Sequence, residues 1–312
     1  MRPPDRPRRP PGTGGLRTCT TPSERRAVLD DPASGITASA WQMNAAQVPR
    51  RYGCGMDASG SARQAPAPLP IIAVASGKGG VGKSSVAVAI GRQLVGRGRR
   101  VGLVDADIAG PDVPRMLGLR RDVPARSITL ARWGRAGQGG SDLEAMEVDG
   151  LKVASAGFLM AGHQGLALGS DLGDLILGRL IRETAWGDVE ALVVDLPPGI
   201  NFTQQGVLSG AGRVTTILVV TPAEVAHLDT SRSLGTLRQV RTPVLGGVEN
   251  MAYFACPCCG EKTDLHEPAP EERTIWAGGV ERLARLPFRP GAVIDPVDLA
   301  PVVDAVETHI AG

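Results

Sequence analysis

The sequence of 312 residues predicts an α/β fold, a doubly wound and mostly parallel sheet with helices on both faces. Three observations support this. Short runs rich in Val and Ile are apolar at successive positions, which is typical of strands buried on both faces. Stretches with helical spacing of apolar residues separate most of these runs. Gly, Pro or Asp bounds each run, so the strands are short and the connections tight.

The elements alternate from residue 70 onward. The expected strands are residues 70–76, 100–107, 151–157, 190–198, 213–222 and 242–250. The expected helices between them are residues 84–98, 170–186 and 225–240. Because strand and helix alternate, the strands run parallel, and ligands are expected at their carboxyl ends. Residues 70–312 are therefore expected to form one domain.

Residues 1–69 differ in composition. They are rich in Pro, Arg and Gly, carry ten arginines against five acidic residues, and end in the linker-like "QAPAPLP". We expect a disordered extension. Its start has no apolar core after the positive residues, so it does not resemble a secretory signal, and a cytoplasmic location is expected. Organelle import is the alternative, because the segment is rich in arginine and poor in acid.

The overall composition excludes some partners. The net charge is +2, which gives no reason to expect nucleic acid as a partner. No run of about 18 apolar residues occurs, so no membrane partner or span is expected.

A phosphate-binding loop follows the first strand. "GKGGVGKS" fits the pattern G-x-x-x-x-G-K-S between a strand and a helix, where backbone N–H groups cradle phosphate oxygens. Lys83 is expected to reach the terminal phosphates of ATP, and the Ser84 hydroxyl to bind Mg²⁺. The expected nucleotide-binding residues of the loop are Gly77, Lys78, Gly79, Gly80, Val81, Gly82, Lys83, Ser84 and Ser85.

Lys78 is one lysine more than a plain phosphate loop needs. In this the stretch resembles the MinD-like class of P-loop NTPases with a deviant Walker A motif. The resemblance implies a homodimer in which Lys78 of one copy reaches the nucleotide of the other and stabilises negative charge, as an arginine finger does. A solvated surface lysine is the alternative.

Three aspartates stand at strand ends. Asp195 ends the apolar run "ALVVD", the Walker B position, where a carboxylate holds Mg²⁺ through water. By the same resemblance, Asp107 would position the attacking water and Asp105 would support the magnesium shell. Each aspartate alone could instead cap a helix. That interpretation does not explain three at one edge of a sheet.

The stretch "ACPCCGE" holds three of the five cysteines, with Cys256 and Cys259 in a C-x-x-C pattern and Cys258 between them. Two thiolates can hold one metal centre but cannot complete a four-thiolate site, whereas two pairs across a twofold axis can. Structural zinc with His266, a redox pair and inert surface thiols are the alternatives.

Several motifs resemble the Mrp/ApbC family of iron–sulfur cluster carrier ATPases over about residues 70–290. They are "KGGVGKSS", "DADIAGPDVPRMLG", "WGDVEALVVDLPPG" and "TPVLGGVENMAYFACPCCG". The family implies a homodimer that bridges a [4Fe–4S] cluster through Cys256 and Cys259 of both copies. ATP binding and hydrolysis would influence cluster transfer to apo-proteins, and the partners would be these client proteins and the cluster assembly machinery. Asn250 would contact the adenine base. A turn asparagine is the alternative for Asn250.

The chain also departs from this family. After "DLPPG" the family usually has Thr-Gly-Asp, a nucleotide-sensing switch, whereas this chain has Ile200, Asn201 and Phe202. We therefore expect ATP hydrolysis to be slow. Cys19 and Cys54 alone cannot form the four-cysteine N-terminal site of some relatives.

Other function classes are weaker. A MinD- or ParA-like positioning switch would explain the deviant Walker A motif but not the cysteines, and the acidic C-terminal segment is unsuited to anionic lipid. A zinc-stabilised protein that binds nucleotide without turnover is a third possibility. A kinase-like transferase would leave the extra lysine unexplained.

Overall fold

The computed structural model describes residues 68–119, 143–159, 170–289 and 294–312. All of the described residues belong to one compact unit, Gln64–Gly312. The extension expected over residues 1–69 lies almost wholly outside the described residues, as do Cys19 and Cys54, and so it stays a prediction.

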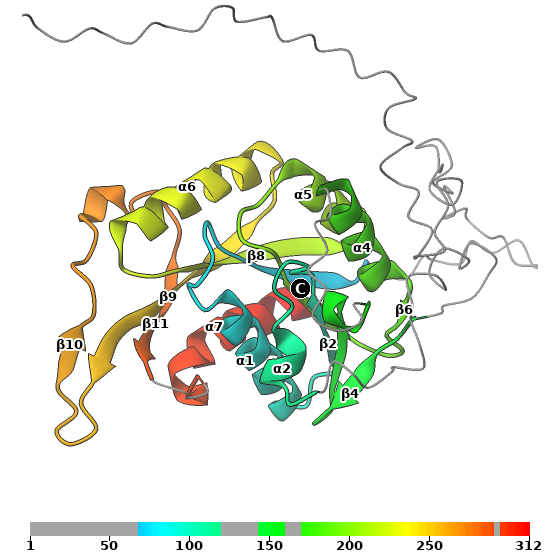
Figure 1. Cartoon of the computed structure of the whole chain (residues 1–312), viewed down its shortest axis with the longest axis horizontal. Coiled ribbons are helices and arrows are strands. Elements are labelled where there is room, and N and C mark those ends of the chain that lie inside the picture. The colour runs from blue at the N-terminus through cyan, green and yellow to red at the C-terminus, as the bar shows by residue number, and fades with distance from the viewer. Residues whose placement is uncertain (1–67, 120–142, 160–169, 290–293) are drawn as a thin grey trace, which may run out of the picture. The chain divides into compact units, whose positions relative to one another are not determined.

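The main sheet is mostly parallel, as predicted (Figure 1). In spatial order its strands are β10 (Lys262–Asp264), β9 (Val244–Ala255), β8 (Arg213–Val220), β1 (Pro70–Ala75), β7 (Ala191–Asp195), β2 (Val101–Asp105), β5 (Leu151–Ser155) and β4 (Met146–Val148). A ninth strand, β11 (Arg282–Phe288), also pairs with β9. Only β10 and β4, at the two ends of this order, pair antiparallel within the part of the chain described. A separate short sheet joins β3 (Leu143–Glu144) to β6 (Thr184–Ala185).

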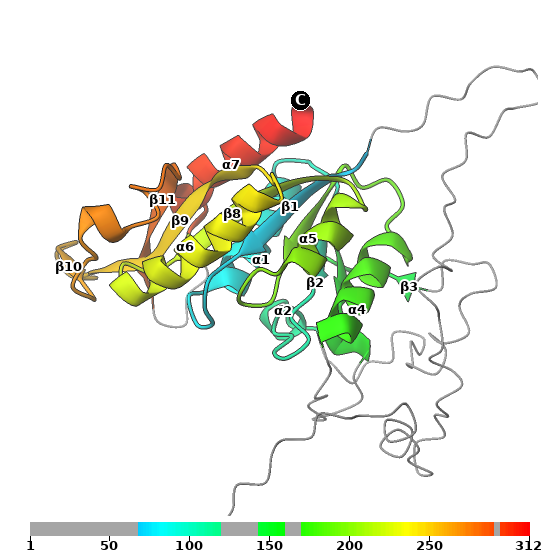
Figure 2. The same ribbon diagram turned by 90° about the horizontal axis from the view of Figure 1, so that it is seen from above.

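Helices cover both faces of the sheet (Figures 1 and 2). One face packs against α1 (Lys83–Gly96), α2 (Val113–Met116) and α7 (Pro296–Ala311). The other packs against α4 (Ser170–Arg182), α5 (Phe202–Ser209) and α6 (Glu224–Gln239). Two single-turn 3₁₀ helices, η4 (Ala156–Leu159) and η5 (Glu271–Arg273), complete the described elements. None of the helices in these ranges is long and apolar enough to cross a membrane.

The central strands are buried on both faces, which explains their continuous apolar sequences. From its second residue on, every residue of β1 is buried, and so is every residue of β2 and of β7. Removing these side chains from water on both sides of the sheet is the main stabilising contribution of the fold.

Parts of the edge beyond β8 were not predicted. The strand expected over residues 242–250 continues to Ala255 as β9, and neither β10 nor β11 was expected. Arginine and proline interrupt the apolar pattern of β11, "RLARLPF", which therefore does not resemble a buried strand.

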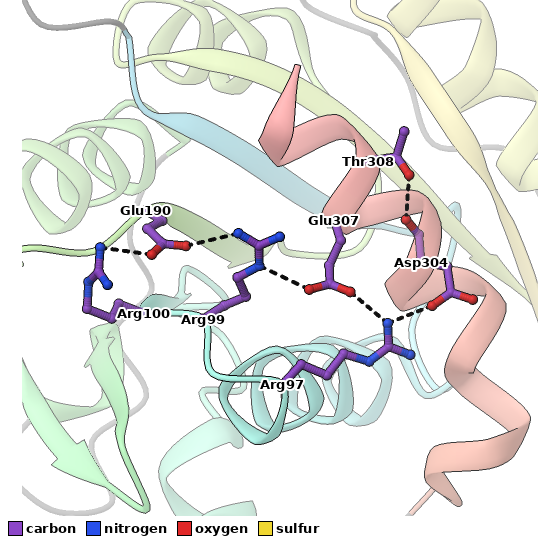
Figure 3. A network of polar contacts seen from close by, with 7 residues as sticks. All are labelled: Arg97, Arg99, Arg100, Glu190, Asp304, Glu307 and Thr308. Carbon is purple, nitrogen blue, oxygen red and sulfur yellow. Dashed lines mark hydrogen bonds and ion pairs between the residues drawn. The ribbon is translucent and has the colours of Figure 1, made fainter.

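A polar network fastens α7 to the rest of the domain (Figure 3). Glu307 of α7 accepts hydrogen bonds from Arg97 at 2.7 Å and Arg99 at 3.0 Å, and Arg99 and Arg100 both pair with Glu190. These residues precede β2 and β7, so the network lies at the edge of the sheet opposite the strand ends where ligands are expected.

Candidate functional site

The phosphate loop joins β1 to α1. Gly82 precedes the helix with φ of 83°, a left-handed conformation that glycine adopts without strain. A Cβ atom at Gly82 would lie 2.2 Å from Nδ2 of Asn250. That amide nitrogen donates a hydrogen bond of 2.9 Å to the Val81 carbonyl, so Asn250 holds the loop from within strand β9, which is distant in the chain. The left-handed conformation favours glycine here, and a Cβ atom would also displace the Asn250 amide from the Val81 carbonyl.

The start of the loop packs against α6. A Cβ atom at Gly77 would lie 2.3 Å from backbone atoms of Asp229 and Thr230. The Gly77 N–H donates to the Thr230 hydroxyl at 3.3 Å, and that hydroxyl in turn donates to the Ala226 carbonyl. The sequence offered no signal for this contact, because Thr230 lies far along the chain in an ordinary helical pattern.

Lys83 and Asp195 form a buried ion pair. The ammonium lies 2.5 Å from Oδ1 of Asp195, and the side chains are 6% and 1% exposed. Burial raises the pKa of Asp195, and the neighbouring Lys83 opposes that shift. The pair joins the phosphate loop to the end of the neighbouring strand β7. The sequence predicted both motifs at the carboxyl ends of strands, and they lie there.

The second oxygen of Asp195, Oδ2, is buried and has no hydrogen-bond partner among the described residues. A buried carboxylate oxygen without a partner is costly unless a ligand completes it. Mg²⁺ in nucleotide sites is held by one or two carboxylates, water and the substrate phosphates. Asp195 with Ser84 beside it therefore suits this ion.

Asp105 lies opposite Asp195 on the adjacent strand β2. Its carboxyl accepts hydrogen bonds from the Ser155 hydroxyl at 2.8 Å and from the Asp107 N–H at 3.3 Å. Burial, and then the negative charge of Asp195, raise the pKa of Asp105 to about 8. Ser155 was not predicted as a site residue, although its position at the end of β5 is the same signal that marked the aspartates.

Asp107 follows in a half-exposed turn, where it accepts a hydrogen bond from the Gly110 N–H at 3.2 Å. Lys78 is half-buried at the phosphate loop, and its side chain makes no ion pair with any residue of the described ranges. Both residues lie at the same edge as Lys83 and Asp195. Their expected roles in positioning water and in reaching a second copy stay predictions.

The altered switch segment lies beside the phosphate loop. The Gly199 N–H donates to the Ser76 carbonyl at 2.9 Å. Ile200 packs against the hydrophobic core, and the Asn201 side chain caps α5 by accepting from the Gln204 N–H at 2.7 Å. Ile200 and Asn201, which the family resemblance aligns with the first two switch positions, thus both contribute to local stability.

The cysteines occupy the turn between β9 and β10, a hairpin at one end of the sheet (Figure 1). The Gly260 N–H closes the turn on the Cys256 carbonyl, and the Cys256 N–H donates to the Glu261 carbonyl, each at 2.8 Å. Hydrogen bonds from the backbone N–H groups of Cys259 and Cys258 lower the pKa of the Cys256 thiol. The turn therefore directs backbone donors at a sulfur.

The thiols are free, with Cys256 half-buried and Cys258 and Cys259 exposed. Within the described ranges, no group of three or more His, Cys, Asp or Glu side chains is arranged to hold a metal ion. The alternative of structural zinc with His266 thus finds no assembled site there. A C-x-x-C pair from one chain supplies only half of a four-thiolate site.

A small cavity of about 120 Å³ lies next to the phosphate loop. Its lining residues come from α1, β9, β11 and the start of α7: Ser85, Asn250, Met251, Leu286, Pro287, Phe288, Arg289, Ile294, Asp295 and Asp298. Asn250 therefore lies between the phosphate loop and this cavity. In the sequence, only the family resemblance indicated that Asn250 belongs to the site.

Comparison with known proteins agrees with this arrangement. Residues 69–309 match the sequence model of the ParA family described as NUBPL iron-transfer P-loop NTPase. The chain belongs to this family. An iron-sulfur cluster carrier protein of Methanocaldococcus jannaschii is 33% identical over 213 residues, which are 67% of this chain and 69% of that protein. The Escherichia coli K12 carrier protein is 35% identical over 205 residues, 66% of this chain, and the chain spans about half of its length.

Solved structures show the same fold. A nucleotide-binding protein of Archaeoglobus fulgidus in complex with ADP has a TM-score of 0.54 at 31% identity and covers 76% of this chain and 88% of its own. The cell division ATPase MinD of Pyrococcus furiosus has a TM-score of 0.53 at 20% identity, covers 77% of this chain and 98% of its own, and shows the fold alone. The chain is therefore an iron–sulfur carrier-family NTPase with a MinD-like fold, as the sequence motifs indicated.

Proposed function

We propose that this chain binds a [4Fe–4S] cluster between two copies of itself and transfers it to apo-proteins, with ATP binding and hydrolysis coupled to the transfer. The observation that carries the proposal is the cysteine turn. It presents two thiols at C-x-x-C spacing, with backbone donors at one sulfur, and the described residues of one chain assemble no complete metal site around them. Two such turns supply the four thiolates of a cluster.

The nucleotide half of the proposal rests on the buried pair. When phosphate enters the loop, Lys83 is free to exchange Asp195 for phosphate oxygens, and Asp195 with Ser84 then holds Mg²⁺. Asp105 supports this shell, Asp107 orients water, and Lys78 of one copy stabilises charge on the nucleotide of the other. In the proposal the adenine base enters the cavity beside Asn250.

The altered switch favours slow turnover. A segment whose Ile200 packs in the core and whose Asn201 caps a helix loses contacts if it moves with the nucleotide. The clients are apo iron–sulfur proteins, and a reducing compartment such as the cytoplasm keeps the thiols free. A MinD-like positioning switch has the fold and the deviant Walker A motif in its favour, but it leaves the cysteine turn without a role.

The test is anaerobic reconstitution with iron and sulfide, followed by metal analysis and native mass. We expect about four irons per dimer in the wild type, and loss of both iron and dimer in Cys256→Ala and Cys259→Ala. Cys258→Ser is the matched control within the same turn and is expected to keep the cluster. Stoichiometric zinc, or iron content that is unchanged in both alanine variants, would contradict the proposal.

A further inference from the structure

Strand β9 carries both a contact to the phosphate loop and the cysteine turn. Asn250 donates to the Val81 carbonyl of the loop, and Cys256 directly follows the last residue of the strand. The loop and the thiols are thus joined by one short stretch of β9. A conformational change at the phosphate loop can reach the cysteine turn through this stretch only if the stretch is rigid.

The backbone of β9 is irregular between these two points. Met251 has φ of 53°, a left-handed conformation that is uncommon for a residue other than glycine. On β11, Arg285 pairs with Glu249 and Pro287 pairs with Tyr253, so β9 advances four residues while β11 advances two. This is a bulge, which bends a strand and interrupts the ladder.

The bulge also lines the cavity beside the phosphate loop. Asn250 and Met251 from β9 and Pro287 from β11 all contribute to its wall. A group that enters this cavity therefore touches the irregular part of both strands. If no other contact crossed the bulge, a displacement of β9 at the cavity would be taken up by bending there and would not reach the cysteine turn.

The side chain of Arg285 spans the bulge. Its Nε donates to Glu249 at 2.8 Å, before the irregularity, and its Nη2 donates to Asp264 at 2.9 Å on the hairpin strand β10. Asp264 pairs with Tyr253, after the irregularity. Glu249 is 7% exposed, so its charge is held in an environment where water screens it poorly.

Tyr253 strengthens this connection at the base of the hairpin. Arg285 lies over its ring with 5.5 Å to the centroid, and Lys262 of β10 lies over the same ring at 4.6 Å. Cation–π contacts of this kind fix the guanidinium relative to both strands. Contacts are therefore continuous from Glu249, next to the loop-contacting Asn250, to strand β10, which follows the cysteines. They join Glu249, Arg285, Asp264, Tyr253 and Lys262.

We propose that Arg285 is a positioning residue that transmits nucleotide occupancy to the cysteine turn by holding Glu249 and Asp264 together across the bulge of β9. The inference rests on the proposed function, because only there are the turn cysteines cluster ligands. It says how nucleotide binding would affect these ligands. It does not require a cluster to be bound, and it can therefore be tested on the apo-protein.

The experiment measures the rate at which the turn thiols react with an aromatic disulfide reagent, with and without saturating Mg-ADP. The full chain carries Cys19→Ser and Cys54→Ser, so that only the turn reports. We expect Mg-ADP to change the rate about fivefold or more, a typical size for coupling between sites. In Arg285→Gln and in Asp264→Asn the change falls below about twofold, while Mg-ADP affinity stays within about twofold of the parent.

The controls match each variant. Arg282→Gln removes a second arginine of β11 that also pairs with Glu249. Arg282 is 46% exposed, against 43% for Arg285, and makes no ion pair with β10 within the described ranges. Glu267→Gln removes an exposed charge close to Asp264 in the chain. Both are expected to keep the nucleotide effect. Asp264 is 54% exposed, so its variant is not expected to unfold the protein.

Two results would overturn the inference alone: thiol reactivity that does not respond to bound Mg-ADP, or a response that Arg285→Gln and Asp264→Asn keep. A response lost equally in Arg282→Gln would overturn it as well, because the bridge to β10 would not be the cause. Failure of the parent protein to bind Mg-ADP at all would instead overturn the nucleotide half of the proposed function, and the coupling with it.

Discussion

Asp105 departs clearly in its ionisation from an exposed aspartate. It is fully buried, faces Asp195 across two paired strands, and its pKa is raised to about 8, chiefly by burial. At neutral pH it therefore stays protonated in the free protein. Its two hydrogen bonds, from Ser155 and from the Asp107 N–H, then fix the start of the turn that carries Asp107.

This pKa predicts the pH dependence of stability in the absence of magnesium and nucleotide. The unfolded chain loses the Asp105 proton at about pH 4, and the folded protein loses it only near pH 8. Between these values the folded state binds more protons, so the group's contribution to the free energy of unfolding falls as pH rises, by roughly 1.4 kcal/mol per pH unit. Urea unfolding of wild type and Asp105→Asn measures it.

The variant is the internal control, because all other groups titrate in both proteins. The stability of the wild type should decline relative to Asp105→Asn across this range. The raised pKa of Asp195 acts in the same direction and remains in the variant, so some slope is expected there too. Parallel pH profiles would show that Asp105 is ionised in the folded protein and would contradict the prediction.

At the residue scale, the sequence predicted the members of the site better than their partners. Lys83, Asp105 and Asp195 were expected at one edge because parallel strands end together, and they lie there. The bridge from Glu249 through Arg285 to Asp264 was not predicted, because it depends on a register shift between β9 and β11. No spacing rule in the sequence encodes such a shift.

At the scale of elements, the phosphate loop depends on α6 as much as on its own helix. Gly77 approaches the backbone of α6 so closely that no side chain fits between them. The helix thereby forms a wall of the loop and accepts a hydrogen bond from the Gly77 N–H through Thr230. The first glycine of the motif serves packing between elements, besides its role in the loop.

We therefore predict that Gly77→Ala destabilises the protein by about 2 kcal/mol, as overpacking does, and weakens nucleotide binding because α6 and the loop move apart. The matched control is Gly79→Ala, where the nearest atom to the new Cβ is Cγ of Pro198 at 3.9 Å. The control should change stability by less than about 0.5 kcal/mol. Chemical unfolding and ADP titration check both, and equal effects in the two variants would contradict the packing argument.

One-sided burial explains why β11 was not predicted. The central strands are continuous apolar runs because helices cover both faces, and their pattern is unambiguous. In β11 buried and exposed residues alternate, and three of its seven residues are arginine or proline. The strand forms because β9 offers it a long ladder and because its arginines find Glu249 and Asp264. Both are contacts with residues distant in the chain, which the local sequence pattern does not reveal.

At the scale of the whole domain, chemistry and stabilisation are separated along the strand direction. The phosphate loop, the aspartates and the cysteine turn all follow the carboxyl ends of parallel strands. The network of Figure 3 lies at the opposite edge and ties α7 to the end of α1 and to the residues before β2 and β7. Substitutions at that edge should change stability without changing the site.

Glu307 is the residue that tests this separation, because it accepts hydrogen bonds from two arginines and is only 22% exposed. Hydrogen bonds from Arg97 and then Arg99 lower its pKa, so its contribution to stability is present at neutral pH and is lost as pH falls below about 4. We predict that Glu307→Gln lowers the urea midpoint at neutral pH and low salt, less so in about 1 M salt, with ADP affinity unchanged.

Asp149→Asn is the matched control for Glu307→Gln, since Asp149 pairs with Arg92 only at 3.8 Å and is 77% exposed. An exposed pair of this kind contributes little, so its urea midpoint should equal that of the wild type. If Glu307→Gln lowered ADP affinity as well as the midpoint, the two edges would be coupled through α1. The site would then depend on the packing of α7, and the separation argued from the strand ends would be wrong.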